Sequence, residues 1–146
     1  YSLGTTLTAA GYLDRAMPAL ERARSLAPKE PVVLEALANL FARSGRLREG
    51  VSALQAAIAA DPDVAGIRIN LGARLLQLGD MTGAEKAWRE ALRLRPESAT
   101  LRINLTNLLA SQGNFAEAEY HFRAAVRIDP NHVGIPDTAN RLSRRE

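Results

Sequence analysis

The pattern of apolar residues repeats along the chain with a period of 34 residues. Within one period a leucine is followed four residues later by a second large apolar residue, as in Leu37 with Phe41 and Leu71 with Leu75. This spacing places both side chains on one face of a helix. Prolines recur at the same interval, at Pro28, Pro62, Pro96 and Pro130. The period therefore predicts several copies of one helical unit.

A column of glycines divides each period into two helices. The glycines are Gly11, Gly45, Gly79 and Gly113. Glycine takes the left-handed backbone conformation without a Cβ clash, so it suits the end of a helix and the turn that follows. Beyond each glycine, small and bulky residues alternate at helical spacing, as in Ala84, Trp88 and Ala91. Small residues facing bulky ones let two helices pack closely. Each period is thus predicted to be helix, tight turn, helix.

We expect helix pairs at about 1–10 with 14–26, 32–44 with 48–60, 66–78 with 82–94, and 100–112 with 116–128. Past Pro130 the period stops, and a last helix is expected at about 136–145. It is interpreted either as a cap with a polar outer face or as the first helix of a truncated fifth repeat.

This pattern resembles the tetratricopeptide repeat (TPR) family. The matching residues are Leu71, Gly72, Ala84, Trp88, Ala91 and Pro96. Arg68 and Arg102 stand where the family often has tryptophan, and Thr106 stands where it has a small residue. The resemblance implies an all-α, right-handed superhelical α-solenoid of about four antiparallel helix pairs with a C-terminal capping helix. It also implies one domain over 1–146, with repeats at about 1–30 (truncated at its N-terminus), 31–64, 65–98 and 99–132.

Composition narrows the possible partners. The net charge of +3 comes with arginines spread around the helices and no continuous basic stripe, so no nucleic-acid partner is expected. No run approaches the roughly 18 to 20 apolar residues of a membrane helix, so no membrane insertion is expected. The chain starts at Tyr1, inside a predicted helix, and we interpret it as a fragment of a longer protein.

Residues suited to catalysis or metal binding are few. The chain has no cysteine and two histidines. Glu117 and His121 lie one helical turn apart, but both are expected on the outer side of their helix, as a surface pair. Zinc sites need three or four ligands, and His132 has no partner visible in the sequence. We therefore expect no enzyme activity, no metal and no cofactor.

The first helices of the repeats are expected to line a concave groove. Its candidate ligand-binding residues are Glu35, Asn39, Arg43, Ile69, Asn70, Gln77, Ile103, Asn104 and Asn107. Asparagine is a poor mid-helix residue, and its amide can both donate to and accept from the backbone of an extended peptide. Two alternatives to ligand binding stay open. Asn70 and Asn104 would instead bind neighbouring helices within the stack, and Ile69 and Ile103 would instead pack between repeats.

Two resemblances within the family refine this picture. Asn70 and Asn104 are similar in position to the asparagine ladder of O-linked N-acetylglucosamine transferases, whereas Ser2 and Ala36 interrupt it. The two-carboxylate clamp of some TPR proteins needs lysines and an arginine on the first helices, and neither Lys29 nor Lys86 lies on one. A clamp of that kind, and a ligand chosen mainly by its negative charge, are therefore not expected.

These observations predict a protein–protein interaction scaffold that holds an extended peptide or partner segment in the groove. A second hypothesis is a self-association or spacer module, in which repeat ends stack into homo-oligomers. A third is a regulatory domain of a larger enzyme whose catalytic part lies outside this chain.

Overall fold

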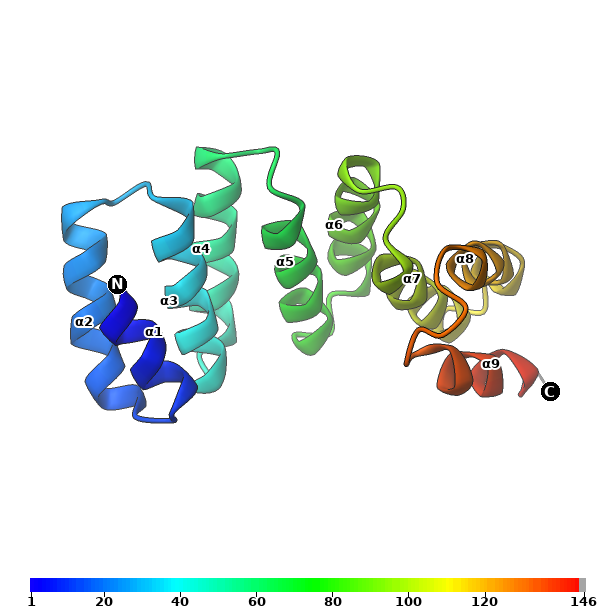
Figure 1. Cartoon of the computed structure of the whole chain (residues 1–146), viewed down its shortest axis with the longest axis horizontal. Coiled ribbons are helices and arrows are strands. Elements are labelled where there is room, and N and C mark those ends of the chain that lie inside the picture. Colours follow the sequence, from blue (N-terminus) through cyan, green and yellow to red (C-terminus); the bar gives the residue numbers. More distant parts are fainter. Residues whose placement is uncertain (145–146) are drawn as a thin grey trace. The chain divides into compact units, whose positions relative to one another are not determined.

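The computed structural model describes residues 1–144, and over that range it contains nine α-helices and no β-strand (Figure 1). The all-α helical-repeat fold predicted from the period is confirmed. Observed helices begin within one or two residues of the predicted positions. Residue 145, the end of the predicted last helix, lies outside the described residues.

The chain divides into two compact units, residues 1–84 and residues from 85 onward. Unit 1 contains α1 (Ser2–Ala9), α2 (Leu13–Leu26), α3 (Pro31–Arg43), α4 (Leu47–Ala60) and α5 (Ala65–Gln77). Unit 2 contains α7 (Ala99–Ser111), α8 (Phe115–Ile128) and α9 (Ile135–Ser143). Helix α6 (Met81–Leu94) begins in unit 1 and contributes most of its length to unit 2.

The glycine column forms the turns between paired helices, as predicted. Its four members have φ between 75° and 86°, and no other residue that the structure describes has a positive φ. At Gly45 the turn is closed by two backbone bonds, from Gly45 N–H to Ala42 O and from Arg46 N–H to Phe41 O at 2.8 Å. These bonds satisfy carbonyls that the end of α3 would otherwise leave free.

The core of unit 1 is built around α3, which contacts α1, α2 and α4. Its buried residues are Ala16, Leu20, Val33, Ala36, Leu37, Leu40 and Phe41. Helix α1 approaches α2 so closely that a Cβ added at Gly4 would lie 2.6 Å from Leu20 Cγ. Glycine at this position is therefore required by the packing of the first helix pair.

The core of unit 2 lies between α7, α8 and α9. Ala99, Ile103 and Ala125 form a buried cluster against Phe122, Ile128 and Ile135. Thr106, which replaces the small residue of the family pattern, is fully buried, and its hydroxyl donates to Arg102 O at 2.8 Å. A bond of this kind satisfies the buried hydroxyl within its own helix.

Helix α9 covers unit 2 as the predicted C-terminal helix. It contacts both α7 and α8 through buried Thr138 and Leu142, and Thr138 Oγ1 donates to Asn107 Oδ1 on α7 at 3.2 Å. Among the described helices, none combines the length and apolar character that crossing a bilayer demands.

Candidate functional site

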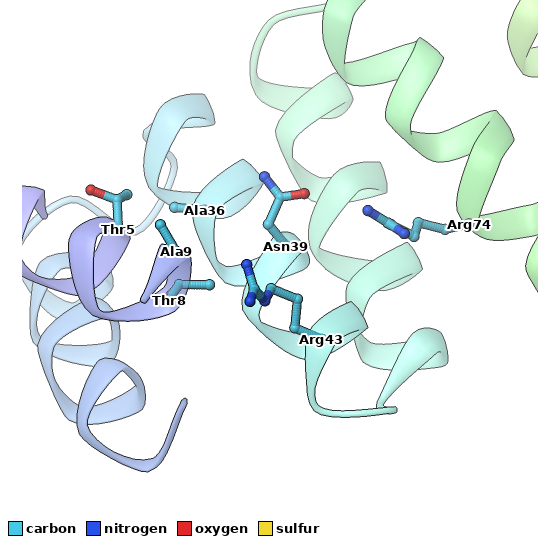
Figure 2. Close-up of a pocket in the computed structure, with 7 residues that line it drawn as sticks. All are labelled: Thr5, Thr8, Ala9, Ala36, Asn39, Arg43 and Arg74. Carbon is cyan, nitrogen blue, oxygen red and sulfur yellow. The ribbon is translucent and has the colours of Figure 1, made fainter. Parts of the chain in front are cut away.

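A pocket of about 350 Å³ lies in unit 1, on the first helices of three successive repeats (Figure 2). It is lined by Thr5, Thr8 and Ala9 of α1, Ala36, Asn39 and Arg43 of α3, and Arg74 of α5. The period accounts for part of this lining, because Thr5 is equivalent to Asn39, and Ala9 to Arg43, 34 residues further on. The prediction that the first helices form a ligand site is thereby given one definite location to test.

Small residues and threonines form the α1 side of the pocket. Thr5 Oγ1 donates to Ser2 O at 2.9 Å, and Thr8 Oγ1 donates to Gly4 O at 2.8 Å. Both hydroxyls thus donate their protons to their own helix, and Ala9 and Ala36 add only methyl groups. The donors that remain for a ligand are the Asn39 amide and the two arginine side chains.

Arg74 extends from α5 toward Asn39 and Arg43 of α3 (Figure 2). One terminal nitrogen of its guanidinium donates to Gln77 Oε1 at 2.9 Å. Its Nε is buried and has no hydrogen-bond partner among the residues that the structure describes. A buried donor without a partner costs free energy, about 1–3 kcal/mol and more for a charged group.

Sequence reasoning missed Arg74, although the period contained the signal. The equivalent positions one repeat earlier and one repeat later are Leu40 and Leu108, which are 0% and 3% exposed. The equivalent residue of the first repeat is Thr6, which is exposed, so arginine stands where the second and fourth repeats bury a leucine. A charged residue in a core column is a stronger indication of a site than a polar residue on an exposed helix face.

The pocket is electrically positive. Its lining includes Arg43 and Arg74 and no acidic residue. Over residues 1–144, neither arginine forms an ion pair. Arg43 is the last residue of α3, where a cation also interacts favourably with the helix dipole. The pocket therefore offers unneutralised guanidinium groups to a ligand.

The other candidate residues of unit 1 surround the pocket. Glu35 of α3 accepts a hydrogen bond from the Asn70 side-chain amide of α5 at 2.5 Å. Gln77 is exposed and accepts from Arg74, whereas Ile69 is half-buried. Of the residues predicted from sequence, the structure brings Asn39 and Arg43 together in the pocket, and it pairs Glu35 with Asn70 beside it.

Three candidates lie in unit 2 on α7. Ile103 is 4% exposed within the cluster described above. Asn107 accepts the hydrogen bond from Thr138 of α9, and Asn104 is half-buried. Ile103 and Asn107 thus have contacts inside unit 2 that account for their residue types without a ligand.

The expected exposure of His121 is wrong. His121 is 5% exposed, because α8 turns this side chain toward α7, on the same face as buried Ala118 and Ala125. Its Nε2 lies 3.7 Å from Glu117 Oε1, and its Nδ1 lies 3.5 Å from an Arg102 guanidinium nitrogen. Burial, followed by the positive charge of Arg102, lowers the pKa of His121 below its ordinary value.

Arg89 of α6 joins two carboxylates in unit 2. It donates to Glu85 at 2.7 Å and to Glu117 of α8 at 2.7 Å. The hydrogen bond from Arg89 lowers the pKa of Glu117, and the bond to Glu117 raises the pKa of Arg89. Within the described residues, no group of three or more histidines and carboxylates is placed to hold a metal ion.

His132 has partners that the sequence did not reveal. The Gly134 N–H donates to His132 Nδ1 at 3.1 Å. The Nε2 of the same ring lies 3.0 Å from Thr100 Oγ1 of α7. His132 therefore fixes the turn before α9 against α7.

Comparison with known proteins identifies the repeat. The family model described as Tetratricopeptide repeat matches residues 35–88 and 69–133. The chain belongs to the tetratricopeptide repeat family. TPR proteins generally mediate protein–protein interactions and are generally non-enzymatic scaffolds. No curated protein sequence matches the chain significantly.

Solved TPR structures share the fold. A crystal structure of MamA is 18% identical, covering 97% of this chain and 91% of its own, with a TM-score of 0.82. TTC0263, a thermophilic TPR protein of Thermus thermophilus, is 21% identical, with coverages of 98% and 77% and a TM-score of 0.75. The first TPR of Spaghetti (RPAP3), bound to the HSP90 peptide SRMEEVD, is 16% identical, with coverages of 79% and 91% and a TM-score of 0.73.

Two TPR repeats of this chain use arginine where the family often has tryptophan. An Arg68 terminal nitrogen donates to Pro62 O at 2.9 Å, and an Arg102 terminal nitrogen donates to Pro96 O at 2.9 Å. Each arginine thus binds the carbonyl of the proline that closes the preceding repeat. The substitution replaces an aromatic contact with a hydrogen-bonded connection between one repeat and the next.

Proposed function

We propose that the chain is a protein-interaction scaffold that binds an extended segment of a partner protein, with the pocket of unit 1 as the centre of contact. The general role of TPR proteins supports this proposal, as does the peptide bound to the Spaghetti repeat. The observation that carries the proposal is the pocket itself, in which three first helices surround one space with small and polar side chains.

The chemistry of the lining suits recognition of a peptide backbone. Ala9 and Ala36 are small enough for a main chain to approach the helices closely. The Asn39 amide can donate to a peptide carbonyl and accept from a peptide N–H at the same time. Such contacts hold an extended segment without regard to most of its side chains.

Asn39, Arg43, Arg74 and Gln77 form the proposed contact set in unit 1. Glu35 and Asn70 bind each other, and we assign them to one wall of the site. In unit 2 the exposed edge of Asn104 is the remaining candidate, while Ile69 adds a half-buried apolar contact in unit 1. We also propose that residues 1–146 form a single TPR domain.

Selection of random displayed peptides on the chain tests this function. A selected peptide is labelled, and its affinity is measured by fluorescence anisotropy for the parent chain, for Asn39→Ala and for Gln55→Ala. Gln55 is exposed on α4 and lies outside the pocket. We expect Asn39→Ala to weaken binding by about tenfold and Gln55→Ala to leave it unchanged. Equal affinities for all three proteins contradict the proposal.

A second candidate function is self-association through the first repeat. Tyr1, Leu3 and Tyr12 are large apolar or aromatic residues at this end of unit 1, and each is at least half exposed. Exposed apolar surface on the end of a repeat stack favours contact with another repeat. Light scattering over a concentration series tests it: a rising mass that Leu3→Ser with Tyr12→Ser abolishes supports self-association, and a constant monomer mass excludes it.

A further inference from the structure

We infer that the pocket of unit 1 selects an anionic side chain within the bound segment, a carboxylate or a phosphate, through Arg74 and Arg43. This inference rests on the proposed function and adds the chemistry of the partner. It departs from the expectation, drawn from Lys29 and Lys86, that the ligand is not chosen mainly by its negative charge, because arginines line this pocket. It differs from a contact with the peptide backbone, because it makes affinity depend on one side-chain charge.

The hydrogen-bonding state of Arg74 is the first argument. A guanidinium has five N–H donors, and the one hydrogen bond that the structure gives Arg74 goes to a neutral acceptor, Gln77 Oε1. Its Nε is buried and lacks a partner among the described residues. A carboxylate or phosphate accepts two parallel hydrogen bonds along one edge of a guanidinium, so either group would supply acceptors for the Arg74 donors that Gln77 leaves free.

The position of Arg74 in the repeat is the second argument. Leu40 and Leu108, at the equivalent positions, are core residues. Arginine at this position buries less apolar surface than leucine and places a charge in a partly desolvated environment. No carboxylate of the described residues forms an ion pair with that charge. An anion brought by the partner removes the cost of that unpaired charge on binding.

A buried Nε without a partner does not by itself indicate a binding site, as Arg102 shows. Its Nε is also buried without a partner among residues 1–144. However, one terminal nitrogen binds Pro96 O and another faces the ring of His121, so its guanidinium is held inside unit 2. Arg74, by contrast, lines a pocket of about 350 Å³ together with a second arginine.

Charge and space in the pocket agree with an anionic occupant. Arg43 and Arg74 approach it from neighbouring helices, and the Asn39 amide adds a neutral donor between them (Figure 2). Glu35, the acidic residue of α3, accepts a hydrogen bond from Asn70 and does not line the pocket. Two unneutralised guanidinium groups at one pocket attract an anion and repel a lysine side chain.

The test uses the full chain and four amidated peptide libraries that are random except at one central position. That position is fixed as glutamate, phosphoserine, glutamine or lysine. We expect the glutamate or the phosphoserine library to bind at least about tenfold more tightly than the glutamine library, and the lysine library to bind worst. Whichever anion binds better identifies the source of the charge.

Four variants connect this preference to the pocket. Arg74→Leu introduces the leucine that the second and fourth repeats bury at this position, so it is expected to fold, and Arg43→Gln removes the second charge. Both should reduce the preference for the anionic libraries by about tenfold. Arg22→Gln is the matched control, because Arg22 is exposed on α2 and lies outside the pocket. It should leave the preference unchanged, and Arg43→Glu should shift it toward lysine.

The outcomes separate the inference from the proposed function. If all four libraries bind the parent chain equally well, peptide binding stands and anion selection is wrong. If the preference survives in both Arg74→Leu and Arg43→Gln, the anion binds elsewhere and the inference is wrong. A preference that appears only with free C-terminal carboxylates also overturns it. If no library binds, the proposed function fails and the inference fails with it.

Discussion

The Asn70 side-chain amide donates a hydrogen bond of 2.5 Å to Glu35 Oε1, which joins α5 to α3 across one repeat boundary in unit 1. Both side chains are partly buried, and the acceptor is a carboxylate. A hydrogen bond to a charged group contributes more to stability than a neutral one. An asparagine that sequence analysis assigns to ligand binding thus also connects neighbouring helices.

Removing this bond should destabilise unit 1. We expect Asn70→Ala to lower the free energy of unfolding by about 1.5–3 kcal/mol, because Glu35 loses a donor in a partly buried position. Urea unfolding followed by circular dichroism measures the change. Asn39→Ala is the matched control, since Asn39 lines the pocket, and it should alter stability by less than about 0.5 kcal/mol. Equal losses in the two variants would contradict this assignment.

Ile103 should be a core residue of unit 2. Ile103→Ala removes a buried side chain from the cluster with Ala99 and Ala125, so the free energy of unfolding should fall by about 2–5 kcal/mol. Thermal unfolding provides the measurement. Leu26→Ala is the control, because Leu26 is 80% exposed and its truncation should change stability by less than about 0.5 kcal/mol. A small effect of Ile103→Ala would instead favour a ligand pocket at that residue.

Acid should destabilise unit 2 through His121. Its folded-state pKa lies below the ordinary value of 6.5, so the unfolded chain takes up a proton at a higher pH than the folded chain. The stability contributed by neutral His121 is therefore complete well above pH 6.5. It decreases as the pH falls below about 6.5, until the folded histidine also becomes protonated.

The variant His121→Leu isolates this contribution. Urea unfolding is measured for both proteins at several values between neutral pH and about pH 5, above the range in which Glu117, whose pKa is lowered, takes up a proton. The parent chain should lose stability over this interval, and His121→Leu should lose less. If the two proteins show parallel losses, the pH dependence arises from other groups.

The contacts of Arg89 should contribute modestly and depend on salt. Arg89→Gln removes the ion pairs with Glu85 of α6 and Glu117 of α8, yet the arginine side chain is 41% exposed and solvent screens it. We expect a loss of about 0.2–1 kcal/mol at low salt. Unfolding at low and high sodium chloride measures it, and the difference between parent and variant should shrink as salt rises. A difference independent of salt would point to packing of the arginine stem.

The fold could be predicted from the sequence because each turn and helix end is decided locally. Gly113 adopts φ 79° as its column predicts, and the predicted helix at 66–78 is observed at Ala65–Gln77. Such features need only the residues beside them. Because the sequence pattern recurs every 34 residues, the same turns and helix ends recur along the chain.

The site depends on contacts that the period does not contain. The bond between Asn107 and Thr138 joins a repeat to a helix beyond the last period, and the bond between Glu35 and Asn70 depends on side-chain conformations. The burial of His121 could have been predicted from the sequence, because His121 lies three residues after Ala118 and four before Ala125, on the small-residue face of α8. Arg74 could also have been identified from the sequence, because the equivalent residues of the second and fourth repeats are leucines, Leu40 and Leu108.

The carbonyls of Pro62 and Pro96 are each bound by the arginine six residues further on. Every such link starts and finishes inside a short segment that contains the joint between two repeats. Duplicating or deleting one whole period would therefore copy or remove a complete link and leave no severed half behind. Recombination in steps of one period can lengthen or shorten a protein of this design while the remaining joints keep their hydrogen bonds.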